Sequence, residues 1–325
     1  MKVLIVGAGQ VGVVYAHHLH QGGAQVSFLV KPKHAAAARE GFHLYRLRVA
    51  RKPQHTHLSG LPVLTSTQEA AAAGPFDVIL LAVPSPALRD GTWLTDLIAA
   101  CPKALFVPLQ LTYGDKEWLA ELLGRERFCQ GFISIISFAA PLGSLKVAEP
   151  GTAYFIPPLA PSPYTGPTSA RPVLQELADA STKGGLYSTV VDNIDGGARL
   201  PDAALFALVS ALELVGWRFD GLKNSDAFPL GLAAAQEREA IFEAVGHGPA
   251  PAALKFLTPT TSRLILCASA KVMPLPLEDF IRVHFIKVNK QFQEERRRIM
   301  AEGAARGVPT PRIKELHERL AHPGA

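Results

Sequence analysis

Short runs of apolar residues alternate with amphipathic segments over the first half of the chain. The first run, Val3 to Val6, is continuously aliphatic, as in a strand that is buried on both faces of a parallel sheet. Further runs follow at 26–30, 78–83, 104–109 and 132–137, with helical patterns at 13–20, 88–100, 115–123 and 173–181. This alternation predicts an α/β fold, a Rossmann-type doubly wound parallel sheet.

The second half has a different periodicity. Apolar residues recur at helical spacing over 202–217, 230–245, 260–272 and 277–306, and prolines or threonine–proline pairs separate these segments. The pattern predicts two domains: a dinucleotide-binding domain over residues 1–193 and an all-helical substrate or dimerisation domain over 194–325. The stretch at 35–60 is irregular apart from strand-like pieces at 42–49, and 157–172 is typical of a surface loop.

Composition narrows the class of protein. With 325 residues, 48% hydrophobic and 19% charged, the chain is typical of an ordinary globular protein. We expect a cytoplasmic protein without a membrane partner, because no signal peptide or membrane-spanning run is evident. The net charge of +5 comes from scattered residues and does not indicate nucleic acid. The three cysteines lack a CxxC spacing, and the histidines fit no ligand set, so we expect no metal.

The first apolar run ends in a glycine motif, Gly7-Ala8-Gly9-Gln10-Val11-Gly12. In the dinucleotide-binding G-x-G-x-x-G, the first glycine allows a sharp turn and the second leaves room for the pyrophosphate. The third lets the helix pack closely on the strand. The following helix directs free N–H groups at the phosphates. The motif therefore predicts a bound dinucleotide.

The second strand ends at Lys31, about twenty residues beyond the glycine turn. NAD-binding domains usually place a carboxylate here, whereas this chain has Lys31-Pro32-Lys33-His34 and no acidic residue in that stretch. A cation at this position suits a 2′-phosphate, so we expect NADP(H) rather than NAD. The alternative is an exposed basic loop.

Several motifs together resemble the ketopantoate reductase family over nearly the whole chain. They are the glycine turn at 7–12, Lys31, the stretch Gln110-Leu111 to Glu117, the strand at 137–140 before Glu149-Pro150-Gly151, and the 307–311 end of the last long helix. The resemblance implies a Rossmann domain followed by a helical domain, and reduction of a 2-keto acid by NADPH. It also implies that Val83, Gln110, Leu111 and Ala140 lie beside the cofactor.

The substrate half of the family pattern is missing. The resemblance implies a catalytic lysine and two asparagines on the first helix of the second domain, but the aligned positions are Phe206, Ser210 and Leu214. We therefore take Glu213 and Ser210, three residues apart on one helix face, as candidate catalytic residues. A buried glutamate could donate a proton or bind a cationic substrate; alternatively Glu213 reaches solvent.

Other candidates for the substrate side remain open. Glu278 opens the last long helix, where the family has an acidic residue, although Gln291 is the alternative counterpart. The remaining candidates, each more typical of a surface or packing position, are Lys223, Lys255, Lys271, Arg263 and Tyr113.

These observations predict an NADPH-dependent reductase that acts on a carbonyl or imine of a small molecule other than ketopantoate. Apolar residues at Leu111, Phe206 and Leu214 suggest a hydrophobic cleft. One alternative is a non-catalytic NADP(H)-binding sensor or scaffold. The other is a genuine 2-dehydropantoate 2-reductase with a relocated proton donor. The long last helix, with apolar residues among its charges, suggests a homodimer contact.

Overall fold

The computed structural model divides the chain into two compact units. Unit 1 comprises Met1–Pro141 and Leu145–Ile194, and unit 2 comprises Leu142–Ser144 and Asp195–Ala325. The structure describes residues 1–111, 115–158 and 160–321, without the side chains of 195–198 and 291.

A parallel sheet forms the centre of unit 1. Its strands are β1 (Lys2–Val6), β2 (Gln25–Leu29), β5 (Val63–Leu64), β6 (Val78–Leu81) and β7 (Leu105–Pro108), in the order β5-β2-β1-β6-β7. All neighbouring pairs are parallel. Successive side chains of β1 point to opposite faces: Val3 and Ile5 join one hydrophobic core, and Leu4 joins the other. This explains the continuous apolar run in the sequence.

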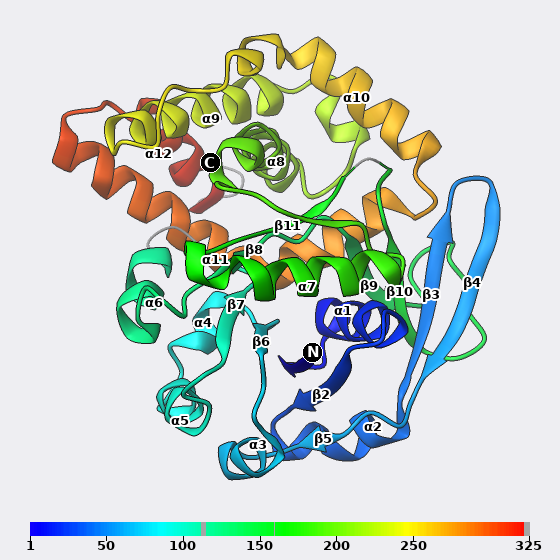
Figure 1. Cartoon of the computed structure of the whole chain (residues 1–325). Coiled ribbons are helices and arrows are strands. Elements are labelled where there is room, and N and C mark those ends of the chain that lie inside the picture. The colour runs from blue at the N-terminus through cyan, green and yellow to red at the C-terminus, as the bar shows by residue number, and fades with distance from the viewer. Residues whose placement is uncertain (112–114, 159, 322–325) are drawn as a thin grey trace. The chain divides into compact units, whose positions relative to one another are not determined.

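Helices cover both faces of this sheet. They are α1 (Gln10–Gln21), α2 (Ala35–Glu40), α3 (Thr67–Ala73), α4 (Ser85–Leu88), α5 (Trp93–Ala100), α6 (Asp115–Leu123) and α7 (Arg171–Lys183). Buried residues of α1 and α7 belong to the first core, and those of α3, α5 and α6 belong to the second. The predicted Rossmann-type doubly wound fold is therefore confirmed (Figure 1).

Two smaller sheets were only partly predicted. One contains β3 (Phe42–Arg48), β4 (Arg51–Leu58), β9 (Ile136–Ala140) and β10 (Gly151–Phe155), in the order β4-β3-β10-β9. The other contains β8 (Gln130–Gly131), β11 (Ser162–Thr165) and β12 (Ser188–Val190). Of the strand predicted at 132–137, only residues 136 and 137 lie in a strand, β9; residues 132–135 connect β8 to β9, which belong to different sheets. The predicted loop at 157–172 contains β11.

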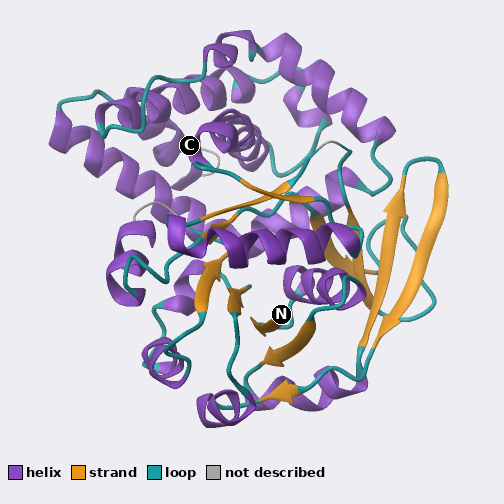
Figure 2. Cartoon of the chain, viewed as in Figure 1, coloured by secondary structure: helices purple, strands orange, loops and turns teal. Residues whose placement is uncertain are grey.

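A long hairpin extends from unit 1 where the sequence is irregular. Strands β3 and β4 pair antiparallel, with Arg48 opposite Arg51 beside the turn (Figures 1 and 2). Strand β3 also pairs in parallel with β10, so β4 is an edge strand. Most of β4 is exposed, and its sequence RKPQHTHL has no alternation of apolar and polar residues. The missing alternation explains why the strand was not predicted.

Unit 2 is built from the helices α8 (Asp195–Leu214), α9 (Ala227–Ala244), α10 (Pro259–Val272), α11 (Leu277–Arg306) and α12 (Pro311–Ala321). Thr258 caps α10 in a reciprocal capping box with Thr261, and Gly307 ends α11 in the left-handed conformation. Helix α12 was not predicted, because only Ile313 and Leu316 of its side chains are buried. Among the described residues, no helix is long and apolar enough to cross a bilayer.

Candidate dinucleotide site

The turn after β1 requires glycine at its first position. Gly7 has a φ of +96°, in the region that only glycine adopts readily. A Cβ there would stand 2.8 Å from Cγ1 of Val83 and 3.2 Å from the carbonyl oxygen of Ala82. The turn therefore packs directly against the residues that follow β6.

The other two glycines differ in what surrounds them. A Cβ at Gly12 would stand 2.0 Å from the carbonyl oxygen of Gly7, so helix and turn contact each other only because this side chain is absent. At Gly9, by contrast, no described atom lies within 4 Å of a Cβ. Gly9 thus faces open space, where a ligand can approach the backbone.

The start of α1 offers hydrogen-bond donors to such a ligand. Gly9 is the N-cap residue and has no side chain to accept from the first turn. The first N–H groups of a helix lack intrahelical acceptors, here those of Gln10, Val11 and Gly12. The first turn contains no acidic residue, so the positive end of the helix dipole is not compensated. This arrangement fits a phosphate.

The carboxyl ends of the parallel strands bring more of the predicted residues to the same edge. Lys31 comes after β2, Val83 after β6 and Gln110 after β7, and these strands are neighbours of β1 or of each other. The chain leaves β1 toward β2 and later returns to β6 on its other side. Ligands of doubly wound sheets bind at such a switch point.

The surroundings of Lys31 differ from the sequence analysis in one respect. Its Nζ lies 3.7 Å from Oδ2 of Asp90, and the two side chains are 67% and 73% exposed. Asp90 lies between α4 and α5, nearly sixty residues away in sequence, so the residues next to Lys31 in the chain do not indicate this contact. The cation therefore has an acidic neighbour that a 2′-phosphate would have to displace or share.

Two of the predicted cofactor residues are buried or partly buried. Ala140 is the last residue of β9, in another sheet, and is buried. Leu111 packs against the second core of unit 1. Tyr113 lies outside the described residues.

Two of the candidate catalytic residues lie close together on α8 in unit 2. Glu213 accepts hydrogen bonds of 3.1 and 3.5 Å from the guanidinium of Arg296 on α11, which is fully buried. The glutamate is therefore held by a partner inside the unit and does not extend into solvent. Ser210 is also fully buried, and its hydroxyl has no hydrogen-bond partner among the described residues.

Glu278 lies elsewhere in unit 2, in the first turn of α11. Its carboxylate accepts a 3.1 Å hydrogen bond from the backbone N–H of Phe219 and lies 3.7 Å from Nε of Arg218. The side chain is 35% exposed. The side chain of the alternative counterpart, Gln291, lies outside the described residues.

The apolar positions on α8 do not line an open cleft within their unit. Phe206 is 2% exposed and belongs to the core of unit 2, and Leu214 packs against the same core. Phe206 is therefore a core residue and gives no support to the predicted hydrophobic cleft, which stays a prediction for the partly buried Leu111 and Leu214. The remaining candidate lysines, Lys223, Lys255 and Lys271, are exposed, and Arg263 donates to the carbonyl of Ser225 at 3.4 Å.

Fold and turn together define a Rossmann-type α/β protein with a helical second unit. The family model described as "Ketopantoate reductase PanE/ApbA" matches residues 3–158, slightly less than half of the chain. Among curated proteins, no sequence matches this one.

Solved structures share the fold over nearly the whole chain. A ternary structure of D-mandelate dehydrogenase with NADH and anilino(oxo)acetate has a TM-score of 0.72 at 18% identity, covering 99% of this chain and 97% of that one. The 2-dehydropantoate 2-reductase from Geobacter metallireducens has a TM-score of 0.66 at 20% identity, covering 99% of both chains. A PanE/ApbA family ketopantoate reductase from Ralstonia eutropha has a TM-score of 0.68 at 20% identity, covering 99% and 97%. The chain therefore has the ketopantoate reductase fold.

Proposed function

We propose that this chain is an NADPH-dependent reductase of the ketopantoate reductase family that acts on a carbonyl or imine substrate other than 2-dehydropantoate. Similarity to 2-dehydropantoate 2-reductases and to a D-mandelate dehydrogenase bound to NADH supports a nicotinamide cofactor. The cofactor, when bound, supplies the hydride. The chain must bind and orient it and provide a proton.

The observation that most supports the proposal is the start of α1, where the N-cap residue Gly9 has no side chain to accept a hydrogen bond from the first turn. Its free N–H groups, the helix dipole and the open space at Gly9 fit a pyrophosphate at the switch point of the sheet. Lys31 at the end of the neighbouring strand favours the 2′-phosphate of NADPH.

Replacing Gly9 with serine tests this site directly. A serine hydroxyl at the N-cap accepts from the N–H of Val11 or Gly12 and so competes with the phosphate. The space around Gly9 is open, so the fold should be unchanged or slightly more stable, by roughly a few tenths of a kcal/mol. We expect NADPH affinity, measured by calorimetry, to fall at least about tenfold, which corresponds to about 1.4 kcal/mol.

Gly12→Ala is the matched comparison. Its Cβ would stand 2.0 Å from a backbone oxygen, so this variant should lose both stability and NADPH binding. If the wild-type protein releases no heat with NADPH or NADH, the proposal is wrong. The same holds if Gly9→Ser binds NADPH as tightly as the wild type.

Ser210, Glu213 and Glu278 are our candidates for the substrate-side groups. A reductase without the family lysine needs another group to stabilise the developing alkoxide or amide anion. Activity with a panel of 2-keto acids, aldehydes and cyclic imines, repeated with S210A, E213Q and E278Q, tests these roles.

The rival function is non-catalytic NADP(H) binding. It is favoured by the finding that Glu213 and Glu278 both already have partners within unit 2. NADPH binding without turnover of any panel member would support the rival. Turnover of 2-dehydropantoate at the highest efficiency would support instead a genuine 2-dehydropantoate 2-reductase.

A further inference from the structure

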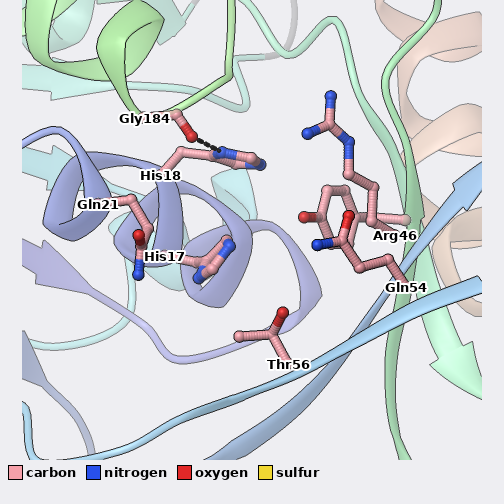
Figure 3. Close-up of a pocket in the computed structure, with 8 residues that line it drawn as sticks. His17, His18, Gln21, Arg46, Gln54, Thr56 and Gly184 are labelled. Carbon is pink, nitrogen blue, oxygen red and sulfur yellow. Dashed lines mark hydrogen bonds between the residues drawn. The ribbon is translucent and has the colours of Figure 1, made fainter.

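A polar pocket of about 250 Å³ lies in unit 1 beside the C-terminal half of α1. Residues of α1, the β3–β4 hairpin, β10 and the end of α7 line it: His17, His18, Gln21, Arg46, Gln54, Thr56, Tyr154 and Gly184. Figure 3 shows the two histidines on one side of the space, opposite Arg46, Gln54 and Thr56.

The sheet pairing places three of these residues in one row. Arg46 on β3 is opposite Gln54 on β4 and is also the register partner of Tyr154 on β10. Side chains at paired positions point to the same face of a sheet, here the face that lines the pocket. Thr56, two residues after Gln54, lies on this face as well.

His18 supplies a buried acceptor. The side chain is 1% exposed, and its Nδ1 lies 2.8 Å from the carbonyl oxygen of Gly184. A carbonyl can only accept, so Nδ1 carries the proton and Nε2 has a free lone pair. Burial lowers the pKa of His18 to about 4, so the ring stays neutral at neutral pH. Nε2 has no hydrogen-bond partner among the described residues, although it lies in the pocket wall (Figure 3).

Arg46 supplies the positive charge. Arg46 and His18 are near neighbours, because both lie beside Gly185. A Cβ added to Gly185 would stand 3.5 Å from Nη1 of Arg46 and 3.7 Å from Nδ1 of His18. The charge of Arg46 contributes to lowering the pKa values of both His17 and His18. Within the described part of the chain, Arg46 takes part in no ion pair. A partly buried guanidinium without a counter-ion favours an anion.

We propose that this pocket binds a small oxyanion that also carries a hydroxyl group, such as a hydroxycarboxylate or hydrogen phosphate. The anionic oxygens accept hydrogen bonds from Arg46, with Gln54 and Thr56 as further donors. The O–H group donates to Nε2 of His18, which a simple anion would leave unsatisfied.

The pocket is separate from the dinucleotide site. Gly9 and Gln10 are at the start of α1, and His18 comes eight residues later, which corresponds to a rise of roughly 12 Å at 1.5 Å per residue. The inference therefore does not depend on the proposed function, and each can fail alone.

Calorimetric titration of the full chain tests the site, with inorganic phosphate and glycerate as probes and nitrate as an anion that lacks a hydroxyl. We expect phosphate, glycerate or both to bind, and nitrate to bind at least about tenfold more weakly. Arg46→Met should weaken binding of the probe at least about tenfold, and Arg46→Lys should restore part of it. Arg51→Met is the matched control, because Arg51 is exposed on the same hairpin and does not line the pocket.

A second measurement identifies the acceptor. On binding, the Nε2 resonance of His18 in ¹⁵N NMR should move as it accepts a hydrogen bond, while that of exposed His20 should not. If Arg46→Met fails to fold, Thr56→Phe, which fills the space from the hairpin, replaces it. The proposal is overturned if neither probe binds, or if binding survives both variants. It is also overturned if nitrate binds equally well, or if the His18 resonance is unchanged.

Discussion

We expect Lys31 and Asp90 together to determine how well the protein distinguishes NADPH from NADH. Both side chains are more than two-thirds exposed, and such pairs contribute only about 0–1 kcal/mol, so a 2′-phosphate can compete for the lysine. We expect Asp90→Asn to tighten NADPH binding by about two- to fivefold, because it removes the repulsion, and to leave NADH unchanged.

Lys31→Glu is the opposite change. It should weaken NADPH by more than about tenfold and affect NADH little, because only NADPH has a phosphate at this position. Titration of each variant with both cofactors, followed by nicotinamide fluorescence, measures the difference. Equal losses for NADPH and NADH would show that Lys31 does not read the 2′-phosphate.

His18 makes the stability of unit 1 depend on pH. Its pKa falls from the ordinary value of 6.5 to about 4 because the ring is buried, so the unfolded chain binds a proton that the folded chain does not. The contribution is fully present above pH 6.5 and decreases as the pH falls toward 4. We expect a loss of about 2 kcal/mol in the free energy of unfolding between pH 7.5 and pH 5.

Urea unfolding at the two pH values measures this loss. His18→Gln removes the titrating group, and the pH dependence should become shallower although the variant is less stable. His20→Gln, an exposed position on the same helix, is the control and should keep the wild-type dependence. An unchanged slope in His18→Gln would rule out this residue as its source.

At the scale of elements, the local sequence predicts the strands and helices whose buried apolar side chains follow a regular pattern. Strand β1 was predicted because both its faces are covered and its residues are all apolar, and the glycines fix the turn into α1. Strand β4 and helix α12 were missed because most of their side chains are exposed. Strand β4 is positioned by pairing with β3, and helix α12 by packing against α9. Neither contact is evident from the local sequence.

The Glu213–Arg296 pair links α8 to α11 in the interior of unit 2. Arg296 is fully buried, so removing its partner leaves a charge without compensation in the interior of unit 2. We expect Glu213→Ala to destabilise the protein by about 3–5 kcal/mol, as for other buried pairs. Chemical unfolding followed by circular dichroism measures this.

Glu294→Ala is the control for this experiment. Glu294 pairs with Arg297 and Arg298 on the exposed side of α11, and its loss should change stability by less than about 1 kcal/mol. If Glu213→Ala were as stable as the control, the pair would not be structural, and the candidate catalytic role of Glu213 would gain support.

At the scale of the whole molecule, the two units differ in how much of a site can be predicted. The dinucleotide turn is contiguous in sequence, and each glycine has a steric reason that is evident from the motif. The candidate groups of unit 2 depend on partners far along the chain: Arg296 lies 83 residues from Glu213, and Phe219 lies 59 residues from Glu278. No pattern near Glu213 indicates that a buried arginine holds it.

The surface of unit 2 supports a prediction about assembly. Leu264 and Val272 on α10 are 65% and 61% exposed, and Val283 and Ile286 on α11 are 50% and 53% exposed. Leu264 and Val272 lie eight residues apart, on one face of α10, and α10 packs against α11. Exposed apolar side chains on two helices that pack against each other favour an interface at this surface.

We therefore expect the protein to be a homodimer through α10 and α11, as the long last helix suggests. Size-exclusion chromatography with light scattering should give twice the mass of the chain. The double variant L264E/I286E should give a monomer, because charges at the centre of an apolar contact cannot be solvated. Val49→Glu, at the exposed tip of the hairpin in unit 1, should leave the dimer intact. A monomeric wild type at about 100 µM, a concentration that exceeds ordinary dimer dissociation constants, would contradict the dimer.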